Sequence, residues 1–481
     1  MIFSSHLFLF YFLPLALLLN YTLPFRYLSL MLTIVSYVFY GWANPPWVLL
    51  MLISSYVDYF CGLGLVRWSG LPAPRGAELP ILDRDTPRNT TQKTLLATSI
   101  ISNLTILALF KYYDFGASSI AALAKTVGID LPLPMLHILL PAGVSFYTFQ
   151  SMSYAIDVYR GDARALRNPI DFQCFVANFP HLIAGPIVRY QTMDQQLRAR
   201  TFTYEKFARG VTFFAIGMSK KILLANPMGY VADHVFAAPA VHCVDAWYGV
   251  ISYAFQIYFD FSGYSDMAVG LGLMFGFLFV RNFDAPYSSA SVTEFWRRWH
   301  ISLSTWLRDY LYVPLGGNRL GRRRTYVNLM TVMLFGGLWH GASWNFVVWG
   351  GMHGTALAVE RAMRGRSGRV PRFAAVALTF GFTSVAWVFF RAETLPAALR
   401  MIASLFGAGT ASSTFLRTIV ITPYHAMMFV ICAIVVWLAP ETWTFTQTLT
   451  PRRAFTVLAM FAISVAVMWT QIENPFLYFR F

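Results

Sequence analysis

Long apolar segments, separated by short polar connectors, recur along the entire chain. Their approximate ranges are 6–23, 28–42, 47–66, 94–110, 136–158, 170–188, 210–224, 247–279, 326–358, 373–390, 424–439 and 455–470. A helix that crosses a bilayer core needs about 20 apolar residues, and several segments are shorter, longer or interrupted. The pattern predicts an all-α polytopic membrane protein with roughly ten to twelve transmembrane or re-entrant helices.

Two of these segments contain breaks, at Pro141-Ala142-Gly143 and at Pro180-His181 and Gly185-Pro186. Irregular backbone at membrane depth is tolerated only where protein buries it or where it lines a wet cavity. The breaks therefore favour a bundle with an internal tunnel or funnel. Because no fixed-period repeat or long linker is visible, we expect one membrane domain over 1–481 and no separate soluble domain.

Composition and charge agree with a membrane protein. Hydrophobic residues make up 57% of the chain and charged residues 12%, against about 25% charged in a typical soluble domain. The net charge of +15 arises largely in connectors near 67–93, 160–167, 319–324 and 361–372, which the positive-inside rule assigns to the cytoplasm. Since no basic groove with interleaved aromatic residues accompanies them, nucleic-acid binding is not expected.

The N-terminal segment is predicted to be a retained first span, because its first basic residue is Arg26 and it has no small-residue cleavage site. Three spans precede the basic connector at 67–93, so we expect the N-terminus on the non-cytoplasmic side. The chain's four cysteines are scattered, and they predict neither a disulfide framework nor a metal site.

The segment Tyr326–Val359 has no Asp, Glu, Lys or Arg but contains His340 and His353. An ionisable side chain at membrane depth is a candidate functional site. His340 follows Trp339, a rigid apolar wall, and glycines on both sides permit close backbone approach. Burial favours the neutral imidazole, which can take a proton from a hydroxyl or thiol as a general base. The alternative is a histidine that only hydrogen-bonds across the bundle. His353 is expected to be structural or tunnel-lining, and Trp339 and Asn345 are candidates to line a substrate tunnel.

A second candidate region is Glu294–Tyr312, whose apolar residues follow helical spacing. It predicts one interfacial amphipathic helix with an i,i+4 pair between Glu294 and Arg298. That helix does not by itself explain His300, for which a functional role and an ordinary interfacial position both remain open.

Two acidic residues, Asp260 and Asp266, lie in an otherwise apolar segment. Buried carboxylates need partners, and Arg297, Arg298 or a histidine are available candidates. Both aspartates and both arginines are also candidates to line a substrate tunnel. A structural ion pair is at least as consistent with the pattern as catalysis. His181, in the segment NFPHLIAGPIVRY, is a further candidate to line a polar cavity.

Common catalytic motifs are absent from the sequence. It has no H-x4-D pair, no G-x-S-x-G elbow, no P-loop and no H-E-x-x-H motif. Broken helices and buried acids also suit a substrate path, so a transporter or flippase is an alternative to an enzyme. A non-catalytic membrane scaffold of an exopolysaccharide export complex is another.

Five segments together resemble the membrane-bound O-acyltransferase (MBOAT) superfamily. They read NFPHLIAGPIVRY, GMSKKILLAN, QIYFDFSGYSDMAVGLG, FWRRWHISLSTWLRDYLYVPLGG and LFGGLWHGASWNFVVWGGMHG, and the resemblance is strongest over 140–355. They are similar to the bacterial branch that includes the alginate O-acetyltransferase membrane subunit and relatives acting on cellulose, peptidoglycan and teichoic acid.

The resemblance implies a ring of tilted helices with the catalytic histidine where two funnels meet. By motif match, His340 takes the place of the near-invariant histidine and His300 that of the second polar residue. An acetyl thioester, acetyl-CoA or an acyl carrier protein, is expected as substrate from the cytoplasm, with no bound cofactor. We expect O-acetylation of an extracytoplasmic polysaccharide, of alginate or cellulose type, at a bacterial inner membrane. A periplasmic SGNH-type partner within a polysaccharide biosynthesis complex would complete the reaction.

Overall fold

The computed structural model describes residues 1–42, 44–72, 78–363, 370–409, 412–470 and 476–477. No strand is present within these ranges, so the prediction of an all-α fold is confirmed. Contacts divide the chain into two compact units, one of 1–210 with 271–279 and one of 211–270 with 280–481. One membrane domain over 1–481 stays a prediction. Parts of two basic connectors, 73–77 and 364–369, lie outside the described residues.

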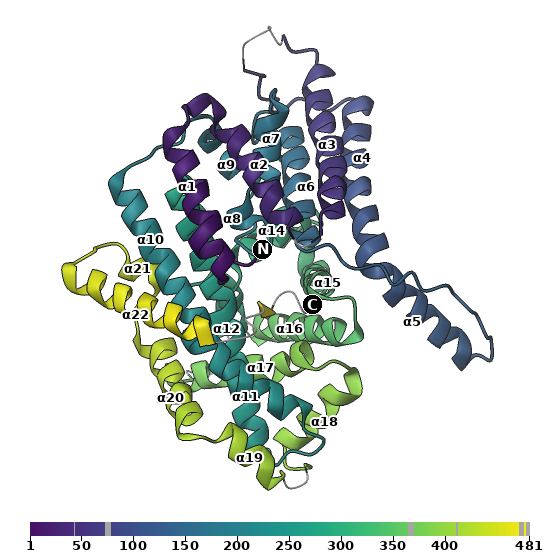
Figure 1. Cartoon of the computed structure of the whole chain (residues 1–481). Coiled ribbons are helices and arrows are strands. Elements are labelled where there is room, and N and C mark those ends of the chain that lie inside the picture. The colour runs from purple at the N-terminus through teal and green to yellow at the C-terminus, as the bar shows by residue number, and fades with distance from the viewer. Residues whose placement is uncertain (43, 73–77, 364–369, 410–411, 471–475, 478–481) are drawn as a thin grey trace. The chain divides into compact units, whose positions relative to one another are not determined.

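The first unit holds the N-terminal helices (Figure 1). Its helices are α1 (Leu13–Thr22, after a π-helical turn Phe8–Phe12), α2 (Leu28–Gly41), α3 (Pro46–Arg67), α4 (Thr90–Leu107), α5 (Tyr113–Thr126), α6 (Val144–Arg160), α7 (Pro169–Ala177), α8 (Phe179–Leu182), α9 (Tyr190–Arg198) and the first turns of α10 (Tyr204–Ser219).

The predicted breaks at 141–143 and 185–186 are present, whereas Pro180 and His181 lie inside α8 and the interruption falls at Asn178. The apolar segment 136–158 becomes helical only at Val144, and 170–188 is divided into α7 and α8. Gly143, immediately before α6, has φ 74°, and a Cβ there would lie 2.8 Å from the carbonyl oxygen of Leu182. Only glycine combines this left-handed backbone with so close a neighbouring chain.

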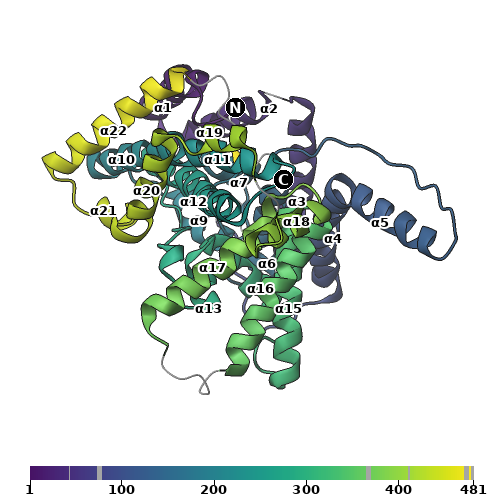
Figure 2. The ribbon, with the colours of Figure 1, turned by 90° about the horizontal axis from the view of Figure 1, so that it is seen from below.

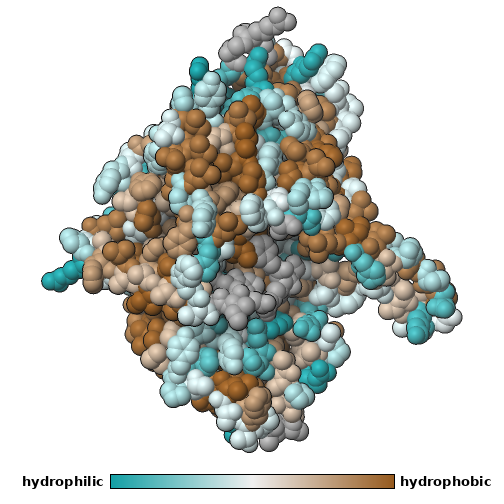
Figure 3. All heavy atoms as spheres, in the orientation of Figure 1, coloured by the Kyte–Doolittle hydropathy of each residue, from teal (hydrophilic) through white to brown (hydrophobic). Residues whose placement is uncertain are grey.

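Helices α1 and α2 expose regularly spaced apolar side chains. Leu15 and Leu18 on α1, and Leu30, Ile34 and Val38 on α2, are each at least 40% exposed. Figure 3 shows apolar surface over these helices. Such an extended apolar surface fits contact with lipid, since soluble proteins rarely leave large apolar patches open.

The second unit contains the remaining helices. They are the end of α10 with a π-helical turn Lys220–Ala225, α11 (Asn226–Ala237), α12 (Cys243–Met274), α13 (Val292–Arg298), α14 (Ile301–Leu307, followed by a π-helical turn Arg308–Tyr312), α15 (Gly321–His340), α16 (Trp344–Met363), α17 (Arg372–Arg391), α18 (Leu395–Leu405), α19 (Thr414–Val420), α20 (Pro423–Leu438), α21 (Thr442–Phe445) and α22 (Pro451–Thr470).

Four helical stretches within the described ranges are long and apolar enough to cross a membrane: Pro46–Arg67, Thr90–Thr126, Arg372–Arg391 and Pro451–Thr470. Helices α19 and α20 qualify together as a fifth, with a bend of 58° between them. Other apolar helices are shorter or carry charge. The number of crossings, ten to twelve, stays a prediction.

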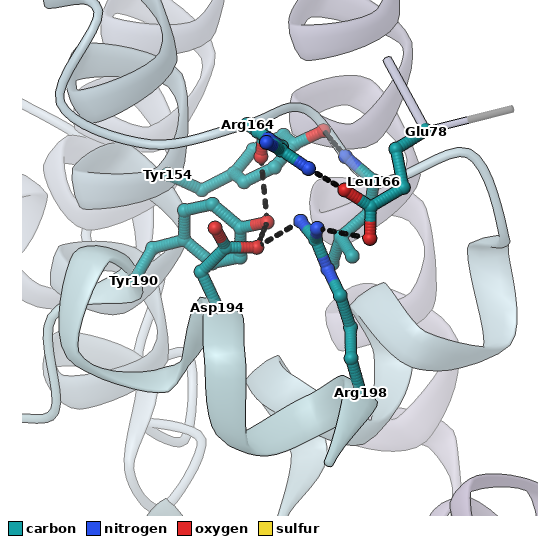
Figure 4. Close-up of polar contacts among 7 residues, drawn as sticks. All are labelled: Glu78, Tyr154, Arg164, Leu166, Tyr190, Asp194 and Arg198. Atoms are coloured by element: carbon teal, nitrogen blue, oxygen red, sulfur yellow. Dashed lines mark hydrogen bonds and ion pairs between the residues drawn. The ribbon is translucent and has the colours of Figure 1, made fainter. Parts of the chain in front are cut away.

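An ionic network ties the connectors of the first unit together (Figure 4). Arg198 on α9 contacts both Glu78, at 2.8 Å, and Asp194, and Arg164 contacts Glu78. The Tyr190 hydroxyl donates to the Arg164 carbonyl oxygen at 2.6 Å and lies 3.0 Å from Asp194 Oδ1. We call Glu78, Arg164, Tyr190, Asp194 and Arg198 the connector network.

Candidate active site

His340 ends α15, at the turn into the neighbouring helix α16 (Figure 2). The apolar segment 326–358, which is longer than one span needs, is divided between these two helices. Glycines make their close packing possible: a Cβ on Gly337 would overlap the Phe346 carbonyl oxygen, and one on Gly350 would overlap the Met333 carbonyl oxygen. Small residues at such contacts let two helix backbones approach closely.

Aromatic side chains surround the His340 ring, which is 4% exposed. The ring centroids of Trp339, Phe390 and Trp349 lie 5.0, 5.1 and 5.3 Å away, at steep angles. His300 is the nearest histidine, with its ring centroid 6.3 Å from that of His340. The two histidines that motif matching singled out therefore share one site.

The single amphipathic helix predicted over Glu294–Tyr312 is wrong. It breaks into α13 and α14 at His300, whose φ of 43° is in the left-handed region. The break follows from pairing with an extended segment: the N–H of Ile301 donates to the Asn282 carbonyl at 2.9 Å, and the N–H of Asp284 donates to the Arg298 carbonyl at 3.0 Å. The expected Glu294–Arg298 pair is confirmed at 2.8 Å.

The break turns the His300 side chain into the interior, where it is 0% exposed. Its Nδ1 lies 3.1 Å from Asn282 Oδ1, which also accepts from the Ser302 backbone N–H at 3.2 Å. A backbone N–H can only donate, so this atom of Asn282 is the amide oxygen. Nδ1 of His300 must therefore carry the proton in the neutral ring.

It follows that Nε2 of His300 carries the lone pair. Nε2 has no hydrogen-bond partner among the described residues. The Asn282 amide is itself held by its Nδ2, which donates to Ser265 Oγ at 2.8 Å. Asn282, Ser265 and Ser302 were not predicted as site residues, because an uncharged polar residue in a single sequence does not by itself indicate a functional position.

His340 lines two cavities of very different size. The larger, of about 480 Å³, lies among α13, α14, α15 and α16, and its wall includes Arg297, Arg308 and Arg361. The smaller, of about 10 Å³, is walled by Asp260, Trp299, Phe390 and the segment Phe476–Leu477. His340 thus lies between a large cavity with three arginines on its wall and a small one whose wall is mainly aromatic and aliphatic.

The two buried aspartates pair with lysines, and not with the arginines or histidine that were candidates from the sequence. Lys221 Nζ lies 2.5 Å from Asp260 Oδ1, and Lys220 Nζ lies 2.8 Å from Asp266 Oδ2. Arg298 pairs with Glu294 instead, and Arg297 lines the larger cavity. Asp266 also accepts from Thr442 Oγ1 at 2.7 Å. These are the buried lysine–aspartate pairs of the second unit.

A π-helical turn places both lysines against α12. The turn begins directly after α10, where Gly217 and Gly263 bring the two helices together; a Cβ on Gly263 would lie 2.7 Å from the Gly217 carbonyl oxygen. Single π-helical turns inside α-helices recur at functional sites. Here the adjacent side chains of Lys220 and Lys221 reach carboxylates six residues apart on one helix.

Two other predicted site residues, His353 and Asn345, make mainly structural contacts. His353 Nδ1 accepts from Trp296 Nε1 at 3.2 Å, and Trp349 lies between it and His340 with centroid distances of 4.8 and 5.3 Å. Asn345 Nδ2 donates to the Ala392 carbonyl at 2.6 Å.

His181 belongs to the first unit, and its role stays a prediction. Its Nε2 lies 3.0 Å from the Phe175 carbonyl oxygen, and its ring packs on Phe279 with centroids 5.1 Å apart.

Comparison with known proteins identifies the chain's relatives. The sequence profile of the membrane-bound O-acyltransferase family matches residues 163–392. A probable alginate O-acetylase, AlgI, of Azotobacter vinelandii is 42% identical over 517 aligned positions that cover 100% of both chains. The chain belongs to the membrane-bound O-acyltransferase family. A second AlgI, of Pseudomonas putida, is 43% identical and also covers 100% of both chains.

A relative with a different named substrate extends the comparison: the peptidoglycan O-acetyltransferase of Helicobacter pylori is 35% identical over 85% of this chain and 80% of its own. The protein is therefore an integral membrane O-acyltransferase, and its resemblance to this family and to its AlgI-like branch is confirmed. The prediction of an enzyme, against a transporter or scaffold, is confirmed with it.

Proposed function

We propose that this chain transfers an acetyl group from a cytoplasmic thioester, at His340, for O-acetylation of an extracytoplasmic polysaccharide in a bacterial inner membrane. The observation that carries the proposal is the position of His340 between the two cavities, beside His300. The names of the relatives, two alginate O-acetylases and a peptidoglycan O-acetyltransferase, support acetyl as the acyl group and a polysaccharide as the acceptor.

The larger cavity is the proposed chamber for the donor. Arg297 and Arg361 on its wall suit the phosphates of CoA or of a carrier protein's phosphopantetheine, because guanidinium groups bind phosphate through paired N–H donors. Arg308, on the same wall, already pairs through Nε and Nη2 with Asp309. The positive-inside rule, applied to the basic connectors at 319–324 and 361–372, supports entry from the cytoplasm. The same rule supports a non-cytoplasmic N-terminus.

Acyl transfer requires a general base and the thioester carbonyl to be held together in a site that excludes water. The acceptor hydroxyl oxygen attacks the thioester carbonyl carbon, its proton passes to the His340 imidazole, and the C–S bond breaks. The proton then returns to the departing thiolate. His300 would orient His340 or the acceptor hydroxyl through Nε2, whose lone pair the Asn282 amide oxygen fixes.

The decisive experiment measures O-acetyl content of the exported polysaccharide in cells that carry His340→Ala in place of the wild-type protein. Loss of acetyl at normal membrane abundance is expected. His353→Gln is the matched control, because it changes a buried histidine of the same helix pair that lines neither cavity. If His340→Ala retains acetylation at normal abundance, the proposal is wrong.

We further propose that the acetyl group reaches the polymer through a separate periplasmic partner of SGNH type, within a polysaccharide biosynthesis complex. Support comes from the similarity of the five motifs to a branch that works in this way. In purified membranes, thioester consumption should then rise when the partner and polysaccharide are added together. Full polymer acetylation without the partner would exclude this division of labour.

A further inference from the structure

We infer that the segment Phe476–Leu477, which follows α22, forms the wall that limits the acyl group at His340 to acetyl. The inference rests on the proposed function and names the structural element that sets acyl length. Both residues line the smaller cavity together with His340, Trp387 and Phe390. They are buried, with exposures of 1% and 6%.

Two specific contacts hold this segment at the site. The backbone N–H of Leu477 donates to Asp260 Oδ2 at 2.8 Å. The Phe476 ring stacks on Tyr264, with centroids 4.4 Å apart and planes at 29°. Both partners lie on α12, so the segment is fixed to the same helix that carries the buried carboxylate.

The anchoring carboxylate is itself held in place. Asp260 pairs through Oδ1 with Lys221, which leaves Oδ2 for the Leu477 N–H. A carboxylate that accepts a backbone N–H is a short, charge-assisted anchor. The Lys221–Asp260 pair thereby connects the π-helical turn after α10 to the wall of the cavity.

The size of the cavity decides which acyl group fits. Its volume of about 10 Å³ matches the roughly 10–15 Å³ that a single water needs. A methyl group is of similar size, so the methyl of an acetyl thioester fits beside His340. Each added methylene would have to displace Phe476, Phe390 or Trp387, and of these only Phe476 lies outside a helix.

The test compares acetyl with propionyl thioesters on the full-length protein in membranes. Both acyl groups are presented on CoA and, separately, on the phosphopantetheine of acyl carrier protein, and His340-dependent thiol release is measured. One methylene in a close-fitting apolar pocket discriminates by about 10–200-fold. We therefore expect the wild-type protein to prefer acetyl at least about 10-fold, and Phe476→Ala to reduce that preference about 10-fold.

Further variants separate a size effect from a general disturbance. Leu477→Ala should shift the ratio in the same direction, and Phe476→Leu should give an intermediate ratio while keeping an apolar contact with Tyr264. Phe455→Ala on α22, where the side chain is 72% exposed, is the matched control and should leave the ratio unchanged.

The outcomes are distinct. If the wild-type protein consumes neither acetyl thioester in a His340-dependent way, the proposed function fails. If acetyl is consumed but all three variants keep the wild-type ratio, or lose both activities in equal proportion, the segment does not set acyl length and the inference is overturned.

Discussion

The connector network of the first unit and the buried lysine–aspartate pairs of the second use the same charges in opposite surroundings. In the network, Glu78 is 55% exposed and Arg164 36%, so water and salt screen their attraction. In the pairs, Lys221 is 6% and Asp260 2% exposed. The network can lose a member and let water replace it, whereas the pairs cannot. The difference predicts that substitutions in the buried pairs lower stability most, and that substitutions in the connector network and changes of salt concentration have smaller effects.

The largest effect is expected from Lys221→Met, which leaves Asp260 buried without its countercharge. Removing one partner of a buried pair destabilises by about 3–5 kcal/mol. Thermal unfolding in detergent should show a strongly lowered midpoint or failure to accumulate folded protein. If the unfolding midpoint of Lys221→Met equals that of the wild-type protein, water reaches Asp260, and the buried pairs do not differ from the connector network in the way described.

The double variant Lys221→Met with Asp260→Leu should recover most of that loss, because neutral apolar groups replacing a buried pair are often close to neutral in stability. The Leu477 N–H loses its acceptor in this variant. Stability should therefore return while acetyl preference does not, as the thermal midpoint and the acyl ratio measured on the same sample will reveal.

The uncharged hydrogen bonds of Asn282 with His300 and Ser265 are also buried, and removing them should have an intermediate effect. Asn282→Ala removes the amide oxygen that fixes the His300 proton on Nδ1. Loss of a buried hydrogen-bond partner is worth about 1–3 kcal/mol, and we expect activity to fall about tenfold or more. Ser265→Ala, which touches only the Nδ2 side of the amide, is the control and should retain most activity in the same thioester assay.

Arg198→Gln in the connector network should change the free energy of unfolding by only about 1 kcal/mol or less, as is usual for partly exposed ion pairs. Arg198 bridges two carboxylates, so it is the position where a larger network effect would appear. A loss comparable with that of Lys221→Met would show that the network is far less accessible to water than its exposed side chains indicate.

The smallest effect is that of salt. The screening length falls from about 10 Å at 0.1 M to about 3 Å at 1 M ionic strength. Raising NaCl over this range should erase the difference between wild-type protein and Arg198→Gln, and leave that of Lys221→Met. Unfolding midpoints at the two salt concentrations provide the measurement; equal salt sensitivity of both variants would argue against the distinction.

Hydrophobic patterning predicted the helices well because lipid contact and core packing both demand it. The ranges 28–42, 47–66 and 373–390 correspond closely to α2, α3 and α17. The break at His300 was missed, since helical spacing continues across it and the cause, Asn282, lies in a separate segment. Local periodicity carries no trace of such long-range pairing.

Within the site, His300 and His340 were predictable from the sequence. The polar residues that hold His300 and its partner amide, Asn282, Ser265 and Ser302, were not. The lysine partners of Asp260 and Asp266 were in principle detectable, because Lys220 and Lys221 interrupt an apolar segment as conspicuously as the aspartates do. Nothing in the residues Phe476 and Leu477 themselves indicated a place at the site, because two apolar residues in an irregular segment match no pattern.

The position of Phe476–Leu477 also fixes an order of events during synthesis. His300, His340, Asp260 and both lysines leave the ribosome before this segment does, and domains of a growing chain begin folding from the N-terminal side. A chain that stalls after α22 would therefore carry the histidines and their supports with the smaller cavity open on one side. The smaller cavity therefore acquires this part of its wall only after His300, His340, Asp260 and both lysines have been made.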